Sequence, residues 1–149
     1  MIAANTGEKP DLCFFLGDGE RDLQLVQERF PELAIHAVRG NCDLRSALPS
    51  FLVCMVGGKR FFLTHGHLYH VKHDPELSDL SRAAKENTAD IVLFGHTHIP
   101  YIQSLDGICI MNPGSIGSFS EASYGVIEIS SEEFQYKIKK ATGKGTDRP

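Results

Sequence analysis

Short apolar runs recur along the chain, and each ends at a glycine or at a polar loop. Runs of this length predict buried strands, which we expect over residues 11–16, 33–38 and 91–94. Further runs are joined by Gly57-Gly58 or by an Asp-Gly pair, which are strong signals for hairpins. The expected hairpins pair 51–56 with 59–63, 101–104 with 108–111, and 124–129 with 134–138.

Two other segments repeat apolar side chains with the period of a helix. They are residues 22–30 and residues 74–87, and in the second we expect Asp74 as N-cap and Pro75 at the first helical position. Strands alternate with helices early in the chain and hairpins follow. This order indicates an α/β (α+β) fold: a parallel or mixed sheet and antiparallel hairpin strands, packed as two sheets that are flanked by helices.

Composition narrows the classes of protein that this pattern allows. The chain has 15 Lys and Arg against 19 Asp and Glu, a net charge of −4, which disfavours a general nucleic-acid binder. No apolar run approaches the length that spans a bilayer, and the first residues lack a secretory pattern. The four cysteines form no CxxC pair, so we expect reduced thiols and a cytoplasmic protein. We expect one domain over 1–138 and a polar, disordered tail over 139–149.

Polar loops open directly after the predicted strands, and each contains side chains that can hold a metal ion or a phosphate. Ligands of open α/β sheets bind beyond the carboxyl ends of the strands, so these loops can converge on one site. The loops contain Asp18; Arg39, Asn41, Cys42 and Asp43; Thr64, His65 and His67; His96 and His98; and Asn112 and Ser115.

The donor types in these loops suit divalent metals. Asp18 offers an anionic oxygen that can bridge two ions, and Asn41 offers a neutral carbonyl oxygen. Imidazoles suit Zn, Fe, Ni or Mn better than Mg or Ca. His96 and His98 would point in different directions from an extended chain, so they serve either two neighbouring ions or one ion through a turn. Each motif alone is common in turns or cores, but the ordered set predicts a metal site.

The order of the motifs resembles that of the calcineurin-like metallophosphoesterases. The motifs are Gly17-Asp18, Gly40-Asn41-Cys42-Asp43, Thr64-His65-Gly66-His67 and Gly95-His96-Thr97-His98. The cysteine of the second motif, the third motif and Asn112-Pro113-Gly114-Ser115 are similar to the small YfcE-like phosphodiesterase branch. The resemblance covers residues 11–138 and implies a two-sheet β-sandwich flanked by helices.

The resemblance also implies a centre of two divalent metal ions, Mn first, with Ni, Zn, Fe or Co as alternatives. Asp18 would bridge the two ions and His98 would bind the second. The ligands that complete the first ion's sphere would be Asn41, His65 and His96. The catalytic residues would be Asp18, Asn41, His65 and His67, and the substrate-binding residues would be Arg39, Cys42 and Asn112.

Two features depart from the family pattern. The family begins with a strand ending in Asp-x-His, which gives two ligands to the second metal, and this chain has no such motif. We therefore expect the first strand and helix of the fold to be missing, which leaves the second ion only Asp18 and His98. The exposed sheet edge could then favour homo-oligomers. Cys42 stands where many members have His, so we expect it to be a neutral wall residue while His67 or water protonates the leaving group.

Three functions remain open at this point. The first is hydrolysis of a small phosphodiester by a metal-activated hydroxide at a binuclear centre, with Arg39 either at the phosphate or solvated. The second is a catalytically impaired scaffold that binds proteins, which resembles the retromer subunit of this fold. The third is a protein with one structural ion, held by Asp18, Asn41, His65 and His96.

Overall fold

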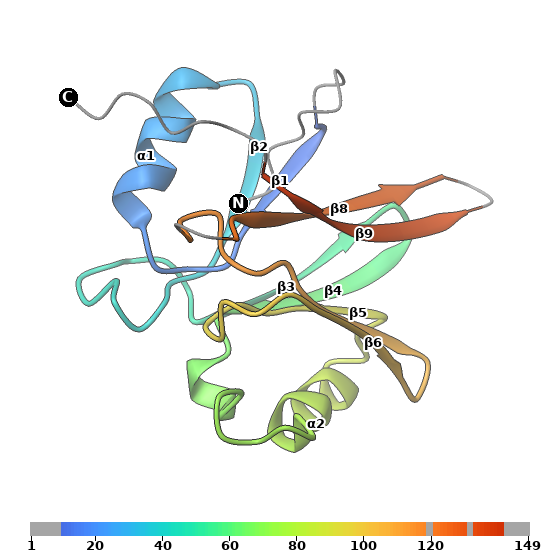
Figure 1. Ribbon diagram of the computed structural model, residues 1–149. Helices are drawn as coiled ribbons and strands as arrows, with labels where there is room; N and C mark the ends of the chain where they lie inside the picture. Colours follow the sequence, from blue (N-terminus) through green and yellow to red (C-terminus); the bar gives the residue numbers. More distant parts are fainter. Residues whose placement is uncertain (1–9, 119–120, 131–132, 142–149) are drawn as a thin grey trace.

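The computed structural model describes residues 10–118, 121–130 and 133–141 (Figure 1). The elements, in chain order, are β1 (Leu12–Phe15), α1 (Glu20–Arg29), β2 (Ala34–Ala37), β3 (Phe51–Val56), β4 (Lys59–Thr64), η1 (His67–Tyr69), α2 (Ser78–Glu86), β5 (Ile91–Leu93), β6 (Tyr101–Leu105), β7 (Ile108–Asn112), β8 (Ser123–Ile129) and β9 (Phe134–Lys140). Within these ranges, no helix is long and apolar enough to cross a membrane.

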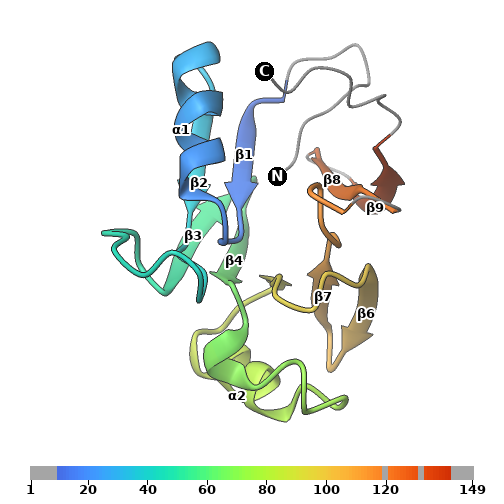
Figure 2. The ribbon, with the colours of Figure 1, turned by 60° about the vertical axis from the view of Figure 1, so that its left-hand side comes forward.

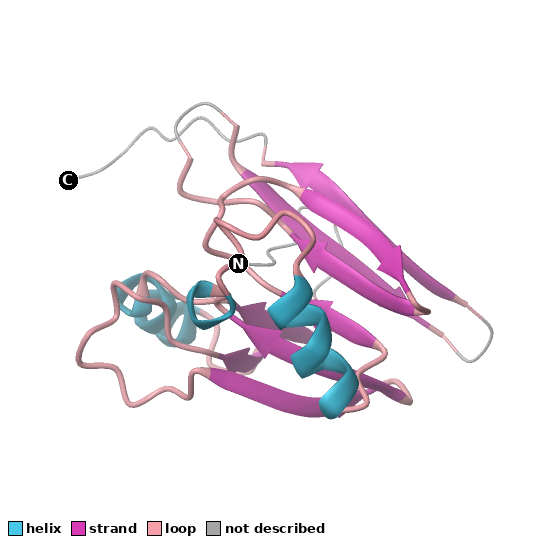
Figure 3. Cartoon of the chain, turned by 90° about the horizontal axis from the view of Figure 1, so that it is seen from below, coloured by secondary structure: helices cyan, strands magenta, loops and turns pink. Residues whose placement is uncertain are grey.

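A mixed sheet of five strands forms the centre of the fold, in the order β3-β4-β5-β7-β6 (Figure 2). Its three inner strands are parallel to one another, and the outer two run antiparallel to their neighbours. The pairs β1-β2 and β8-β9 form a second layer over one face, while α2 covers the opposite face and α1 lies beside β1-β2 (Figures 1 and 3). The expected fold of packed sheets flanked by helices is confirmed, with the second layer divided into two pairs among the described strands.

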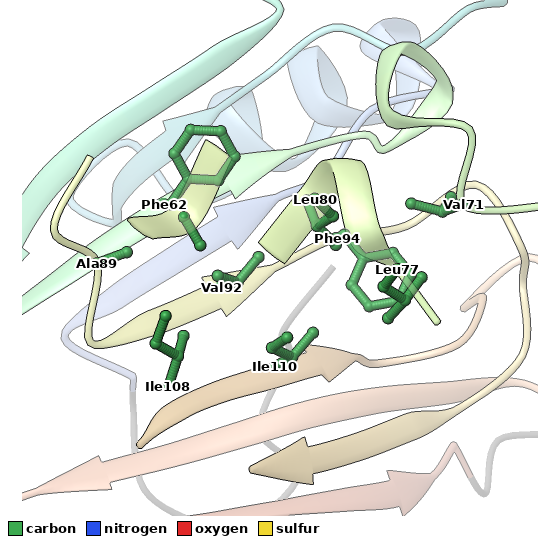
Figure 4. Close-up of a cluster of buried hydrophobic side chains, with 10 residues drawn as sticks. Phe62, Val71, Leu77, Leu80, Ala89, Val92, Phe94, Ile108 and Ile110 are labelled. Atoms are coloured by element: carbon green, nitrogen blue, oxygen red, sulfur yellow. The ribbon is translucent and has the colours of Figure 1, made fainter. Parts of the chain in front are cut away.

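Apolar side chains fill both sides of the central sheet, because both of its faces are covered. The cluster beneath α2 consists of Phe62, Val71, Leu77, Leu80, Ala84, Ala89, Val92, Phe94, Ile108 and Ile110 (Figure 4). The cluster on the other face joins Phe61, Leu63 and Met111 to Phe14 of β1, and Ile127 and Tyr136 of β8-β9 pack against it. Among the described strands, those of one layer form no ladder with those of the other, so apolar contacts between the layers hold the sandwich together.

The glycine-containing turns confirm two of the predicted hairpins. Gly57 and Gly58 have φ of 55° and 76°, and Asp106 and Gly107 have φ of 51° and 81°. Two successive left-handed residues are the backbone of the tight turn that joins twisted strands, and glycine or Asp adopts it at low cost. The third predicted hairpin, β8 with β9, is also present.

The second helix begins later than its pattern predicted. The carboxylate of Asp74 accepts hydrogen bonds from the backbone N–H groups of Glu76 (3.1 Å) and Ser78 (2.7 Å). Leu77 has a left-handed φ of 53°, which interrupts helical geometry, so α2 begins at Ser78. The prediction of Asp74 as N-cap and Pro75 as first helical residue was wrong, since these side-chain bonds form a turn there instead.

The C-terminal strand is longer than its apolar pattern predicted. β9 continues through Lys140, and the pairs Ser123 with Lys140 and Tyr124 with Lys139 extend the β8-β9 ladder. The prediction of disorder was therefore wrong for residues 139–140. Residues 142–149 of that tail lie outside the described residues, as do residues 1–9.

Candidate metal centre

Loops that follow strands of both layers open on one cleft of about 700 Å³. Parallel strands end at the same edge of a sheet, which brings loops far apart in sequence together. Residues from the β1, β2, β4 and β5 loops meet in this cleft, among them Asp18, Cys42, His65, His96 and His98. The loop after β7, residues 113–118, forms a further wall.

Four metal-capable donor atoms converge around the ring of His65. Nε2 of His65 lies 3.2 Å from Oδ2 of Asp18, 3.1 Å from Oδ1 of Asn41 and 3.1 Å from Nδ1 of His96. An ion with bonds of about 2.0–2.2 Å keeps neighbouring ligand atoms roughly 3.0–3.5 Å apart. The observed separations fit one divalent ion held by these four side chains.

The fixed orientation of His65 explains why its Nε2 is available as a donor. The side chain is 2% exposed, and its Nδ1 lies 2.7 Å from the backbone oxygen of Leu16. A carbonyl oxygen can only accept, so Nδ1 donates the hydrogen bond to Leu16, and Nε2 is the ring nitrogen that faces the other metal-capable side chains. This bond of a ring nitrogen to a carbonyl is typical of metal-binding histidines.

The two histidines of the loop after β5 occupy different positions. Burial, followed by the charges of Lys72, His65 and His67, lowers the pKa of His96 from 6.5 to about 4, so its ring is neutral at pH 7. His96 and His98 have left-handed φ of 66° and 61°, so this segment turns and does not run extended. His98 lines the cleft but lies outside the group formed by Asp18, His65 and His96.

His67 stands beside this group. Its ring centroid lies 5.4 Å from that of His65 and 6.2 Å from that of His96. Burial first, then the charges of His65 and Arg39, lowers the pKa of His67, so it is also neutral at pH 7. Its Nδ1 is buried and has no hydrogen-bond partner within the described part of the chain. Buried polar atoms are almost always paired, so an unpaired one in such a place points to a group that binds there.

Cys42 lies exposed at the mouth of the cleft. Its backbone N–H donates to Oδ1 of Asp18 at 2.8 Å, and its Sγ lies 3.4 Å from Nδ2 of Asn41. The charge of Asp18 raises the pKa of the thiol, so Cys42 is protonated and neutral at pH 7. This geometry favours the wall residue that the sequence suggested over an acid or a nucleophile.

Asn112 lies beneath the cleft and is fully buried. Its Nδ2 donates to the backbone oxygen of Gly95 (2.8 Å) and to Oγ1 of Thr97 (2.9 Å), and its Oδ1 accepts from the N–H of Gly114 (3.0 Å). The amide therefore ties the loop after β5 to the loop after β7. In this geometry it positions His96 and does not line the cleft.

Sequence reasoning gave no role to Asp43, although the structure places it at the centre of a network. Its carboxylate accepts hydrogen bonds from backbone N–H groups of both the loop after β1 and the loop after β2. Burial alone would raise the pKa of Asp43, but these four bonds lower it below its usual value. The available signal was the place of Asp43 after Gly40 and Asn41, which is typical of a carboxylate that binds turn N–H groups.

A layered α/β fold with carboxylate, amide and imidazole donors at the strand ends defines a group of side chains that could hold a divalent metal ion. Residues 2–132 match the model of the calcineurin-like phosphoesterase superfamily domain. The chain belongs to this superfamily, as the order of its motifs indicated.

Named relatives and solved structures agree with this assignment. Phosphodiesterase YfcE of Escherichia coli strain K12 is 34% identical over 116 residues, which are 69% of this chain and 58% of that protein. The chain spans less than two thirds of the length of the curated relatives that it matches first. A predicted phosphoesterase from Streptococcus pneumoniae has a TM-score of 0.74 and 32% identity, with 89% of this chain and 75% of that chain covered. Vps29 of Entamoeba histolytica, solved in complex with zinc, shares the fold, with a TM-score of 0.68, 24% identity, and 92% and 84% covered.

Proposed function

We propose that the protein is a metal-dependent phosphodiesterase that hydrolyses a small phosphodiester. The observation that carries this proposal is the convergence of Asp18, Asn41 and His96 on Nε2 of His65. These polar donor atoms contribute nothing to apolar packing, whereas a divalent ion requires several of them close together. Bound ions, Mn first, would supply an activated water and offset charge on the phosphoryl oxygens.

A second ion in the cleft is part of the proposal. Asp18 has two oxygens with free lone pairs, since Oδ2 faces His65 while Oδ1 accepts one N–H from Cys42. Asp18 would bridge the ions, and His98 would contact the second from the cleft wall. Elemental analysis of the loaded protein tests this step: two ions per chain support it, and one ion per chain favours the single-ion alternative.

His67 and Arg39 are the proposed contacts for the phosphate. The unpaired Nδ1 of His67 and the charge of Arg39 beside it suit an anionic oxygen. A neutral histidine donates a hydrogen bond but does not readily give up its proton, so solvent water would supply the proton to the departing alkoxide. Cys42, neutral at the mouth of the cleft, would contact the ester group and transfer no proton.

Hydrolysis of bis(p-nitrophenyl) phosphate tests the function directly. We expect turnover only with added Mn, Ni or Co, and His65→Ala should reduce it by at least about a hundredfold, because a ligand is lost. His70→Ala is the matched control, since His70 is an exposed histidine paired with Asp79 outside the cleft. Equal activity in the two variants would contradict the proposal.

A protein-binding scaffold is the second candidate, because Vps29 has the same fold. The two functions predict different titrations. A scaffold would bind metal without turnover of any aryl phosphodiester, whereas the enzyme would show turnover that follows metal occupancy. The presence of His65, His96 and His98 together in the cleft favours the enzyme, because a pure scaffold has no need of that set.

A cytoplasmic location and self-association complete the proposal. All four cysteines are free, which suits a reducing compartment. Light scattering after size-exclusion chromatography would test for homo-oligomers, and a monomer at all concentrations would contradict that part alone.

A further inference from the structure

Asp43 connects the two loops that carry Asp18 and Asn41. Its Oδ2 accepts the N–H groups of Asp18 and Gly40, both at 2.8 Å. Its Oδ1 accepts the N–H groups of Gly19 (3.0 Å) and Glu20 (3.3 Å) at the start of α1. Asp43 follows β2 and Asp18 follows β1, so the bonds from Asp18, Gly19 and Glu20 cross to a loop distant in sequence, while the bond from Gly40 lies within the loop of Asp43.

The connection between the two loops is reciprocal and close. Oδ1 of Asp18 accepts the N–H of Cys42 at 2.8 Å, so each loop places a carboxylate on the backbone of the other. A Cβ added to Gly17 would lie 2.5 Å from the backbone nitrogen of Gly40, and a Cβ added to Gly40 would collide with the carboxylate of Asp18. Glycine is required at both positions because the backbones approach without room for a side chain.

We propose that Asp43 is a positioning residue for the metal centre: it holds the loop that carries Asp18 against the loop that carries Asn41. This inference rests on the proposed function, since it assigns a role to Asp43 only through the metal ligands. Two of its four hydrogen bonds come from the backbone of Asp18, a proposed ligand, and of Gly40, which precedes Asn41. Neither bond caps a helix. A cap of α1 alone would need only the bonds from Gly19 and Glu20.

The substitution that isolates this role is Asp43→Asn. It keeps the size of the side chain but replaces one oxygen with an NH₂ group, which donates and does not accept. The remaining oxygen can accept one pair of N–H groups, either from Asp18 and Gly40 or from Gly19 and Glu20, so the other pair loses its acceptor. Loss of a hydrogen-bonded partner behind metal ligands typically lowers metal affinity by about 10–100-fold. We expect a loss of that size for Mn²⁺, with the four ligands unchanged.

Asp74→Asn is the matched control. Asp74 also accepts two backbone N–H groups before a helix, those of Glu76 and Ser78, but it lies outside the cleft. Isothermal titration of the full chain with Mn²⁺ gives the affinity, and thermal unfolding of the metal-free protein gives the stability. Both variants should lower the melting temperature, and only Asp43→Asn should weaken Mn²⁺ binding.

The outcomes separate the positioning role from a merely structural one. An unchanged Mn²⁺ affinity in Asp43→Asn, or an equal loss in both variants, would overturn the inference while the proposed function stands. If Asp43→Asn does not fold, Asp43→Glu replaces it; this variant keeps the charge but displaces the oxygens, and native affinity there would equally overturn the inference. Absence of Mn²⁺ binding by the wild-type chain would instead remove the proposed function, and the inference with it.

Discussion

The core beneath α2 and the loops that follow β1, β2, β4 and β5 differ in the chemistry of their side chains. We call these loops the loop edge. The core consists mainly of apolar side chains, and Phe62, Leu80 and Val92 in it have no exposed surface. The loop edge is polar, and Asp18, His96 and His98 there have left-handed φ between 59° and 66°. A non-glycine residue in this conformation costs roughly 1–2 kcal/mol, so the edge stores strain that the core has to offset.

The core therefore supplies the stability of this fold, and the loop edge carries the side chains for its chemistry. Burial of apolar surface fixes the layers, and the layers then hold strained loops that could not persist alone. Changes in the core should therefore alter the free energy of unfolding without altering metal binding per folded molecule. Changes at the loop edge should do more to metal binding than to unfolding.

Leu80→Ala should give the largest effect on stability. Leu80 is on α2 and fully buried, and truncation of such a side chain leaves a cavity that costs about 2–5 kcal/mol. Urea unfolding followed by circular dichroism measures the change. Mn²⁺ affinity, measured on the folded fraction, should equal that of the wild type. A loss of Mn²⁺ affinity in the folded fraction would show that the core and the loop edge are coupled, and would contradict their separate roles.

Gly40→Ala should have a smaller effect on stability and a larger one on the site. The new Cβ would meet the carboxylate and backbone of Asp18, and overpacking of this kind typically costs about 1–3 kcal/mol. Because Asp18 must shift, Mn²⁺ affinity should fall in calorimetric titration. Gly117→Ala is the control, since the nearest other atom, Oγ of Ser115, would lie 3.9 Å from its Cβ. Similar affinity in both variants would contradict the close approach of the loops.

The layers of the fold were predictable because local signals specify them. Apolar runs predicted the bounds of β1 and β5 to within two residues. The turn at Gly57-Gly58 was predictable because both of its residues have positive φ, which glycine adopts readily. The start of α2 was not predictable from periodicity, because the side-chain bonds of Asp74 compete with helix formation. The end of β9 was missed because its polar residues 139–140 are paired with β8, and pairing is not a local property.

The candidate site was predictable in its donor types and less so in its supports. The motifs named Asp18, Asn41, His65 and His96, and the structure brings these side chains together. They could not show that Asn112 braces a loop from below, or that Asp43 joins two loops. Both roles depend on backbone groups that approach only in the folded chain.

The metal-free protein should lose stability in acid because His96 is neutral in the folded chain. Its pKa is about 4 when folded and 6.5 ordinarily, so the unfolded chain binds the proton first as the pH falls. The stability that depends on a neutral His96 is fully present above about pH 6.5 and is lost as the pH falls towards 4. His96→Asn lacks this titration. The melting temperature of the wild type minus that of the variant should decrease from pH 7 to pH 4, and a constant difference would contradict it.

Lys72→Gln should give the smallest effect, a rise in the pKa of His96. After burial, the charge of Lys72 is the largest cause that holds this pKa down, and Lys72 is exposed, so its removal should not disturb the core. Imidazole titration by NMR on the metal-free protein measures the shift. Lys85→Gln is the matched control, because Lys85 pairs with Asp106 beside α2 and has no part in the pKa of His96. If both substitutions leave that pKa unchanged, the charge of Lys72 has no part in keeping His96 neutral, and burial by the layers of the fold remains the main cause.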